Sequence, residues 1–127
     1  MRITDYLEVR EGICEFRPRG ECSLVEAVQL IAGAIAYCRD RSVGKLLVDG
    51  QGLVGVPIPS LVDRFLMAEE WAQEANGRVV VALVIQAEYI HPQKFGMKVA
   101  ADFGLVSDVY TSETDALAWL SSVADPI

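Results

Sequence analysis

The sequence predicts an α/β domain in which a mixed β-sheet, an N-terminal hairpin followed by parallel strands, is covered by about four helices. Two alternating apolar and polar runs joined by Glu11 and Gly12 are typical of a hairpin. The apolar segments 45–49 and 78–85 are typical of strands that are covered on both faces. Helical patterns alternate with these strands, and such an order favours parallel strands joined by right-handed crossovers.

The first half of the chain contains the hairpin and one long helix. The runs 6–10 and 13–17 form the hairpin, with four residues expected to face the core: Leu7, Val9, Cys14 and Phe16. Ser23 and Glu26 have the spacing of a capping box that opens a helix, and Gly44 can end it. Apolar residues then recur at helical spacing and are predicted to point inward: Leu24, Ala27, Val28, Ile31, Ile35 and Cys38.

The second half alternates strands with three further helices. After the strand 45–49, Ser60 with Asp63 opens a helix that is predicted to bury Leu61, Phe65, Ala68, Ala72 and Ala75. The strand 78–85 follows, and Pro92 is placed at the first position of a third helix, with an inward stripe of Phe95, Val99 and Phe103. A strand at 107–110 and a helix from Ser112, carrying Ala116, Leu120 and Val123, complete the pattern.

Composition narrows the possible functions. The 127 residues fit one domain, 1–127, and the formal net charge of -7 disfavours nucleic acid and anionic membrane surfaces as partners. No apolar run reaches the ~18 residues of a membrane-spanning helix, so we expect no membrane insertion and a cytoplasmic protein. With three unpaired cysteines and one histidine, the sequence predicts neither a metal site nor a cofactor.

The segment after the strand 45–49 is the predicted binding surface. Open α/β sheets bind their ligands outside the carboxyl ends of the strands, and glycines there let a backbone approach a partner closely. The residues predicted to form this partner-binding loop are Asp49, Gly50, Gln51, Gly52, Gly55 and Ser60.

Residues of this segment also allow two other interpretations, a dinucleotide-binding loop and part of a catalytic triad. The three glycines match the text of a dinucleotide fingerprint, but Pro57 and Pro59 delay the helix whose N-terminus would hold the pyrophosphate. Asp49, Ser60 and His91 could be written as a hydrolase triad, yet no nucleophile elbow surrounds Ser60 and helix capping explains it. The sequence therefore predicts no catalytic residues, and the chain is not expected to be an enzyme.

Large apolar residues outside the inward stripes suggest a second contact region. Met67 and Trp71 are four apart and fall off the predicted stripe of their helix, so they form either a partner or dimer surface or part of the core. Together with Phe95 they could also line a cavity for an apolar ligand. Leu30 and Tyr37 lie off the stripe of the first helix and make a homodimer a further possibility.

Over nearly its whole length the chain resembles the STAS domains, especially their bacterial SpoIIAA-like branch, which includes anti-sigma-factor antagonists and is compared with Sec14-type lipid-binding domains. The matching features are the hairpin, the strand 46–49 with its loop and helix, the apolar strand 79–85 and the ending 108–120. The resemblance implies regulation by a partner, such as an anti-sigma-like kinase that phosphorylates a serine near the start of the second helix. Only Ser60 could be that phosphoacceptor here, although its neighbours depart from the family pattern.

The leading hypothesis is accordingly a non-catalytic regulatory or protein-interaction module that binds a protein partner, or a second copy of itself, through residues 49–60 and the helix that follows. The alternative hypothesis is a carrier or sensor of a small apolar, lipid-like ligand. The two hypotheses differ in where binding occurs, because the first needs an exposed surface and the second needs a cavity.

Overall fold

A five-stranded mixed sheet forms the central layer of the protein in the computed structural model, which describes residues 2–126. Its strands lie in the order β1 (Leu7–Arg10), β2 (Ile13–Phe16), β4 (Lys45–Asp49), β6 (Val80–Val84) and β7 (Ser107–Tyr110). β1 pairs with β2 antiparallel, and the other neighbouring strands pair parallel. Both the hairpin and the parallel strands are therefore confirmed.

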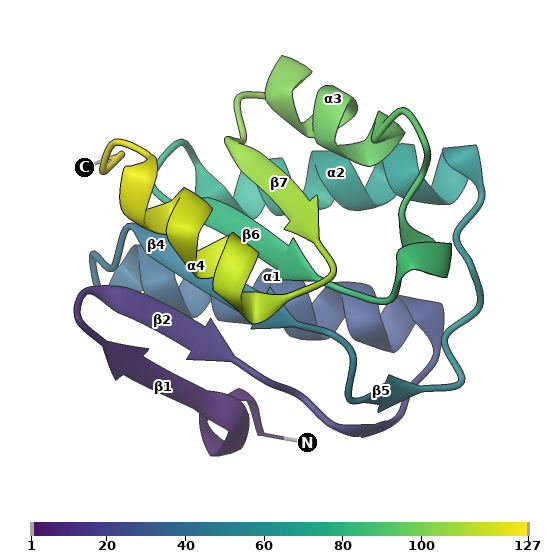
Figure 1. Ribbon diagram of the computed structural model, residues 1–127, viewed down its shortest axis with the longest axis horizontal. Coiled ribbons are helices and arrows are strands. Elements are labelled where there is room, and N and C mark those ends of the chain that lie inside the picture. Colours follow the sequence, from purple (N-terminus) through teal and green to yellow (C-terminus); the bar gives the residue numbers. More distant parts are fainter. Residues whose placement is uncertain (1, 127) are drawn as a thin grey trace.

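Four helices cover this sheet, as predicted: α1 (Leu24–Asp40), α2 (Leu61–Ala75), α3 (Phe95–Asp102) and α4 (Glu113–Ser122). In Figure 1, α4 lies in front of the sheet, while α1 and α2 lie behind it. The larger core cluster joins α1, α2 and α3 to the sheet, and the smaller one joins Ala116 and Leu120 of α4 to Leu47, Val80 and Val84. β6 is buried along its whole length because it has helices on both faces.

Serine caps start the helices where the sequence places them. The Oγ atoms of Ser23 and Ser60 accept hydrogen bonds from the backbone N–H groups of Glu26 and Asp63, both at 3.1 Å, and the acidic side chains accept in return. These reciprocal bonds satisfy donors that a helix N-terminus otherwise leaves unpaired. At the start of α4 the Ser112 Oγ accepts from the Asp115 N–H at 3.2 Å.

Helix α2 buries the C-terminal part of its predicted inward stripe but not the N-terminal part. Leu61 and Phe65 are 53% and 42% exposed, so their assignment to the core is wrong. Trp71, predicted to lie off the inward face, is only 5% exposed, and its Nε1–H donates to the Val28 carbonyl at 3.1 Å. Ala68, Ala72 and Ala75 are buried, as predicted, and pack in the same core cluster as Trp71. Leu61 and Phe65 in the first turns of α2 lie on the same side of the helix as these alanines but beyond this buried segment, so they face solvent.

Three smaller predictions are also wrong. Val9 is 49% exposed, because β1 is the edge strand and the helices pack over strands further into the sheet. Phe103 follows the last turn of α3 and is exposed as well. Pro92 does not begin α3, which starts at Phe95 after Lys94 adopts a left-handed conformation with φ +51°. The short 3₁₀ helix η2 (Ala87–Tyr89) occupies part of the intervening chain.

A small two-stranded parallel sheet, β3 (Gly20–Glu21) with β5 (Leu53–Val54), was not predicted from the sequence. The N–H of Gly20 donates to the Gly52 carbonyl at 3.1 Å, and that of Cys22 donates to the Val54 carbonyl at 2.9 Å. These bonds fix the glycine loop to the segment before α1. The other short element is the 3₁₀ helix η1 (Ile3–Tyr6), and no helix among residues 2–126 has the length and hydropathy needed to cross a bilayer.

Candidate functional site

Polar groups gather where β4 and β7 end at the carboxyl edge of the sheet. Arg17, just after β2, donates from Nε and Nη2 to the two carboxylate oxygens of Glu113 at 2.9 and 2.7 Å. Its Nη2 also lies 2.8 Å from Oε1 of the buried Glu15. Asp49, the last residue of β4, lies next to Glu113 and can share a hydrogen bond with it when one of the two carboxyl groups is protonated. We call these four residues the carboxylate cluster: Glu15, Arg17, Asp49 and Glu113.

The two adjacent carboxyl groups in the cluster differ in acidity. Burial and the hydrogen bond to Glu113 raise the pKa of Asp49 to about 6. Hydrogen bonds from Arg17 and Asp49 lower the pKa of Glu113 to about 2. One proton therefore resides on Asp49 in mildly acidic solution, while Glu113 stays ionised against Arg17.

We expect this shared proton to make stability depend on pH. The pKa of Asp49 is about 6 in the folded state against 3.8 normally. Its contribution to the free energy of unfolding is therefore present below about pH 4 and is lost as pH rises through 6. The contribution of Glu113 is instead lost as pH falls from 4.5 towards 2. The free energy of unfolding of the wild-type protein should fall by about 1–2 kcal/mol between mildly acidic and neutral pH, after allowance for partial solvent exposure. In Asp49→Asn this fall should be absent, because the amide does not titrate. Urea unfolding across that range measures it, with the exposed Asp5→Asn as control, and a slope unchanged by Asp49→Asn would contradict the assignment.

The predicted partner-binding loop is held mainly by its own chain. The N–H of Gly50 donates to the Val84 carbonyl at 2.8 Å, and the Gln51 side chain donates to the Thr111 carbonyl at 3.4 Å. A Cβ on Gly52 would lie 2.8 Å from the Pro18 carbonyl oxygen, so this glycine serves close packing within the protein. Gly55 has φ +87°, and its glycine is explained by that turn. Both glycines therefore have a role within the fold, and their part in binding a partner stays a prediction.

The three residues of the triad interpretation have other partners. Asp49 belongs to the carboxylate cluster, and Ser60 is committed to the α2 capping box. His91 accepts at Nδ1 from the Gln93 N–H at 3.1 Å, and its ring lies beside that of Phe95. None of the hydrogen bonds described within residues 2–126 joins two of the three side chains. The same part of the chain contains no group of three His, Cys, Asp or Glu residues able to hold a metal ion.

An apolar surface lies on the outer side of α2. We call it the α2 patch, and its members are between 42% and 68% exposed: Leu61, Val62, Phe65, Leu66 and Phe103. The four helical members share one side of the helix because residues three and four apart, such as Val62 with Phe65 and Leu66, are neighbours on a helix. Phe103 extends the patch from the end of α3, since its ring meets that of Phe65 edge-on at a centroid distance of 5.6 Å. Ser60 begins the helix that carries this patch and is itself exposed.

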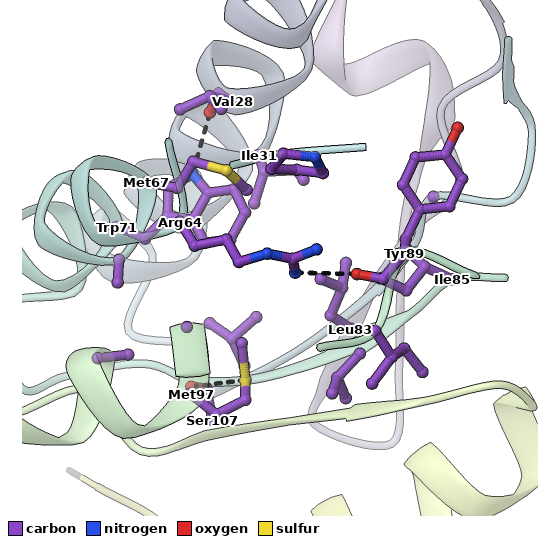
Figure 2. Close-up of a pocket in the computed structure, with 18 of the residues that line it drawn as sticks. Val28, Ile31, Arg64, Met67, Trp71, Leu83, Ile85, Tyr89, Met97 and Ser107 are labelled. Atoms are coloured by element: carbon purple, nitrogen blue, oxygen red, sulfur yellow. Dashed lines mark hydrogen bonds between the residues drawn. The ribbon is translucent and has the colours of Figure 1, made fainter. Parts of the chain in front are cut away.

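A cavity of about 120 Å³ lies on the other side of the same helix, between α1, α2, α3 and the sheet. Figure 2 shows Val28 and Ile31 from α1, Met67 and Trp71 from α2, and Leu83 from β6 around it. Most of its walls are apolar. Four titratable side chains other than tyrosine line it: Arg64, His91, Lys94 and Asp108.

Comparison with protein-family models, with curated proteins and with solved structures finds no match. The resemblance to the STAS domains stays a prediction.

Met67 and Trp71, singled out from the sequence, both line the cavity, while Phe95 is half-buried against the core and is not among the lining residues. Sequence reasoning missed Arg64. The signal was present, because Arg64 precedes Met67 by three residues and Trp71 by seven, which places all three on one helix face. A cation on a face that also carries methionine and tryptophan indicates a partly polar cavity.

Proposed function

We propose that this protein is a non-catalytic regulatory or interaction domain that docks a protein partner through the α2 patch and the adjoining loop. The observation that carries the proposal is the exposure of five large apolar side chains on one continuous surface. Small monomeric domains rarely leave such clusters in water unless a partner covers them, and aromatic and leucine side chains can fill the centre of an interface. The carboxyl-edge position of the loop supports the same surface.

Charge indicates what kind of partner fits. Apart from Arg64, which lines the cavity, the charged residues of α2 are acidic: Asp63, Glu69, Glu70 and Glu74. With a chain charge of -7, the surface favours a partner whose apolar centre is bordered by lysine and arginine. A second copy of this chain would bring like charges together, so a homodimer through this surface is disfavoured.

A pair of matched variants tests the proposal. Val62 and Val25 are both highly exposed, and each is the second residue of a helix that begins with a serine capping box. The wild-type protein would capture a partner from its host, and the candidate would be identified, purified and titrated by calorimetry. We expect Val62→Asp to weaken binding at least tenfold and Val25→Asp to leave it unchanged, with binding weaker at high salt.

Two outcomes would contradict it. Equal binding of the purified partner by wild-type protein and Val62→Asp would remove the α2 patch from the interface. A wild-type dimer in sedimentation that Val62→Asp dissociates would make a second copy the occupant instead. Thermal unfolding of both variants checks that neither result comes from lost structure.

The resemblance to anti-sigma-factor antagonists adds a regulatory element to this proposal. Ser60 is exposed and lies at the positive end of α2, where the helix dipole would favour a phosphate. A phosphate there would add negative charge beside the α2 patch and next to Asp63. It would therefore change the charge of the docking surface without removing buried contacts.

A second candidate function is the binding of a small ligand in the cavity. The observation that favours it is the largely apolar wall with a few convergent polar groups, which is the usual composition of a small-molecule site. This candidate keeps the protein non-catalytic, as a carrier or sensor. Docking and ligand binding use opposite sides of α2, so they are compatible.

A further inference from the structure

We propose that the cavity binds a monocarboxylate of about ten non-hydrogen atoms, with its carboxylate on Arg64 and its apolar body between Met67, Trp71 and Leu83. The inference rests on the second candidate function and specifies its ligand. Three observations support it: the pairing of charges in the wall, the direction of the Arg64 side chain and the volume of the space.

The charges that line the cavity do not cancel. The Nζ atom of Lys94 lies 2.7 Å from Oδ1 of Asp108, and this ion pair neutralises both groups. Burial alone would raise the pKa of Asp108, but hydrogen bonds from Lys94 and the Val109 amide lower it, so the carboxylate is ionised. Arg64 then remains as one uncompensated positive charge, because no carboxylate within residues 2–126 forms a salt bridge with it. One negative charge on a ligand would neutralise Arg64.

The Arg64 guanidinium is positioned to receive that charge. Its Nη1 donates to the Tyr89 carbonyl at 2.9 Å, which fixes the group across the cavity and leaves other N–H donors of the fork available (Figure 2). Tyr89 is itself held, since its hydroxyl donates to the Val56 carbonyl at 2.6 Å. The planar fork matches a carboxylate, to which it can donate in pairs.

A second donor lines the same cavity. His91 accepts at Nδ1 from the Gln93 amide, so the neutral imidazole carries its proton on Nε2. This N–H adds a polar group that can hydrogen-bond a carboxylate oxygen. Met67, Met97 and Trp71 line the remainder, and flexible thioethers adapt to the shape of an apolar body.

The volume limits the size of the ligand. A single water occupies roughly 10–15 Å³ of such a space, so 120 Å³ accept about ten atoms of that size. Octanoate and 3-phenylpropanoate fit within this volume, whereas palmitate, with about eighteen non-hydrogen atoms, would have to extend through the open side of the cavity into solvent. The cavity therefore favours a short-chain or aryl-alkyl acid over a full-length fatty acid.

Titration of the ¹⁵N-labelled full chain by NMR tests the proposal, with octanoate, 3-phenylpropanoate, octan-1-ol and palmitate as probes. We expect at least one of the two short acids to bind with a Kd of about 10–500 μM and to shift the amide signals of α2 and β6. Arg64→Gln should weaken that acid at least tenfold and leave octan-1-ol unchanged. The control is Arg78→Gln, which changes an arginine outside the cavity lining. If Arg64→Gln unfolds, Arg64→Lys keeps the charge without the fork and should give a smaller loss.

The outcomes distinguish a wrong ligand class from the absence of any ligand site. If octan-1-ol binds as tightly as the acids and Arg64→Gln changes nothing, the carboxylate assignment is wrong while a ligand site remains. If none of the four probes binds, the second candidate function fails as well. Ala100→Leu adds bulk to the lining and should abolish binding of the short acids, and undiminished binding to that variant would place the acid elsewhere.

Discussion

Replacing Trp71 with alanine is expected to lower the free energy of unfolding by about 3–5 kcal/mol. The indole is nearly fully buried between α1 and α2, and the variant would lose its packing and leave a hole that adjoins the cavity. Its Nε1–H also satisfies the carbonyl of Val28. Equilibrium urea unfolding followed by far-UV circular dichroism measures the change.

Two further variants show where that energy comes from. Trp71→Phe keeps an aromatic ring but removes the hydrogen bond, so we expect a smaller loss of about 1–2 kcal/mol. Trp119→Ala changes the partly buried tryptophan of α4 and should likewise cost less than Trp71→Ala. Equal losses for Trp71→Ala and Trp119→Ala would show that α2 is not docked through its indole.

Arg17→Met is expected to destabilise the protein by about 2–3 kcal/mol at neutral pH. Within residues 2–126, Arg17 is the one cation that contacts both Glu15 and Glu113, and its removal leaves Glu113 without an ion pair and Glu15 with only the longer contact to Arg10 at 3.5 Å. The estimate lies below that for a fully buried pair because Arg17 is about one-third exposed. The methionine retains much of the apolar stem, so lost charge dominates the effect.

The pH dependence identifies the cause of this loss. Protonation of the carboxylates at low pH removes their mutual repulsion, so the deficit of Arg17→Met should shrink between neutral pH and about pH 4. Arg10→Met is the control, because Arg10 is well exposed and its ion pairs should contribute less than about 1 kcal/mol. Chemical unfolding at both pH values provides the comparison, and a deficit independent of pH would contradict the electrostatic explanation.

Much of the fold could be predicted because its signals are local. The capping boxes at Ser23 and Ser60 fix two helix starts within three residues of sequence, and the valine-rich apolar run 80–84 indicates a strand with two covered faces. The length of α2 that contacts the core could not be predicted in this way. Leu61 and Phe65 continue the periodicity of the buried alanines, and only the tertiary packing decides where along the helix burial begins.

The candidate site was less accessible to prediction. Pairing of β3 with β5 joins residues more than thirty positions apart, and neither two-residue strand has a sequence pattern of its own. The carboxylate cluster likewise joins Arg17 to Glu113, which are 96 residues apart. Met67 and Trp71 could be singled out because they are large, whereas Arg64 shares their helix face but gains its significance from the cavity that all three line.

The edge position of β1 has a consequence for solution behaviour. This strand has only four residues, two of which, Glu8 and Arg10, are charged and exposed. A short outer strand with charged side chains is a poor template for backbone hydrogen bonding by a neighbouring molecule. The sheet is thereby protected from extending into fibrous aggregates on this side, even in concentrated preparations.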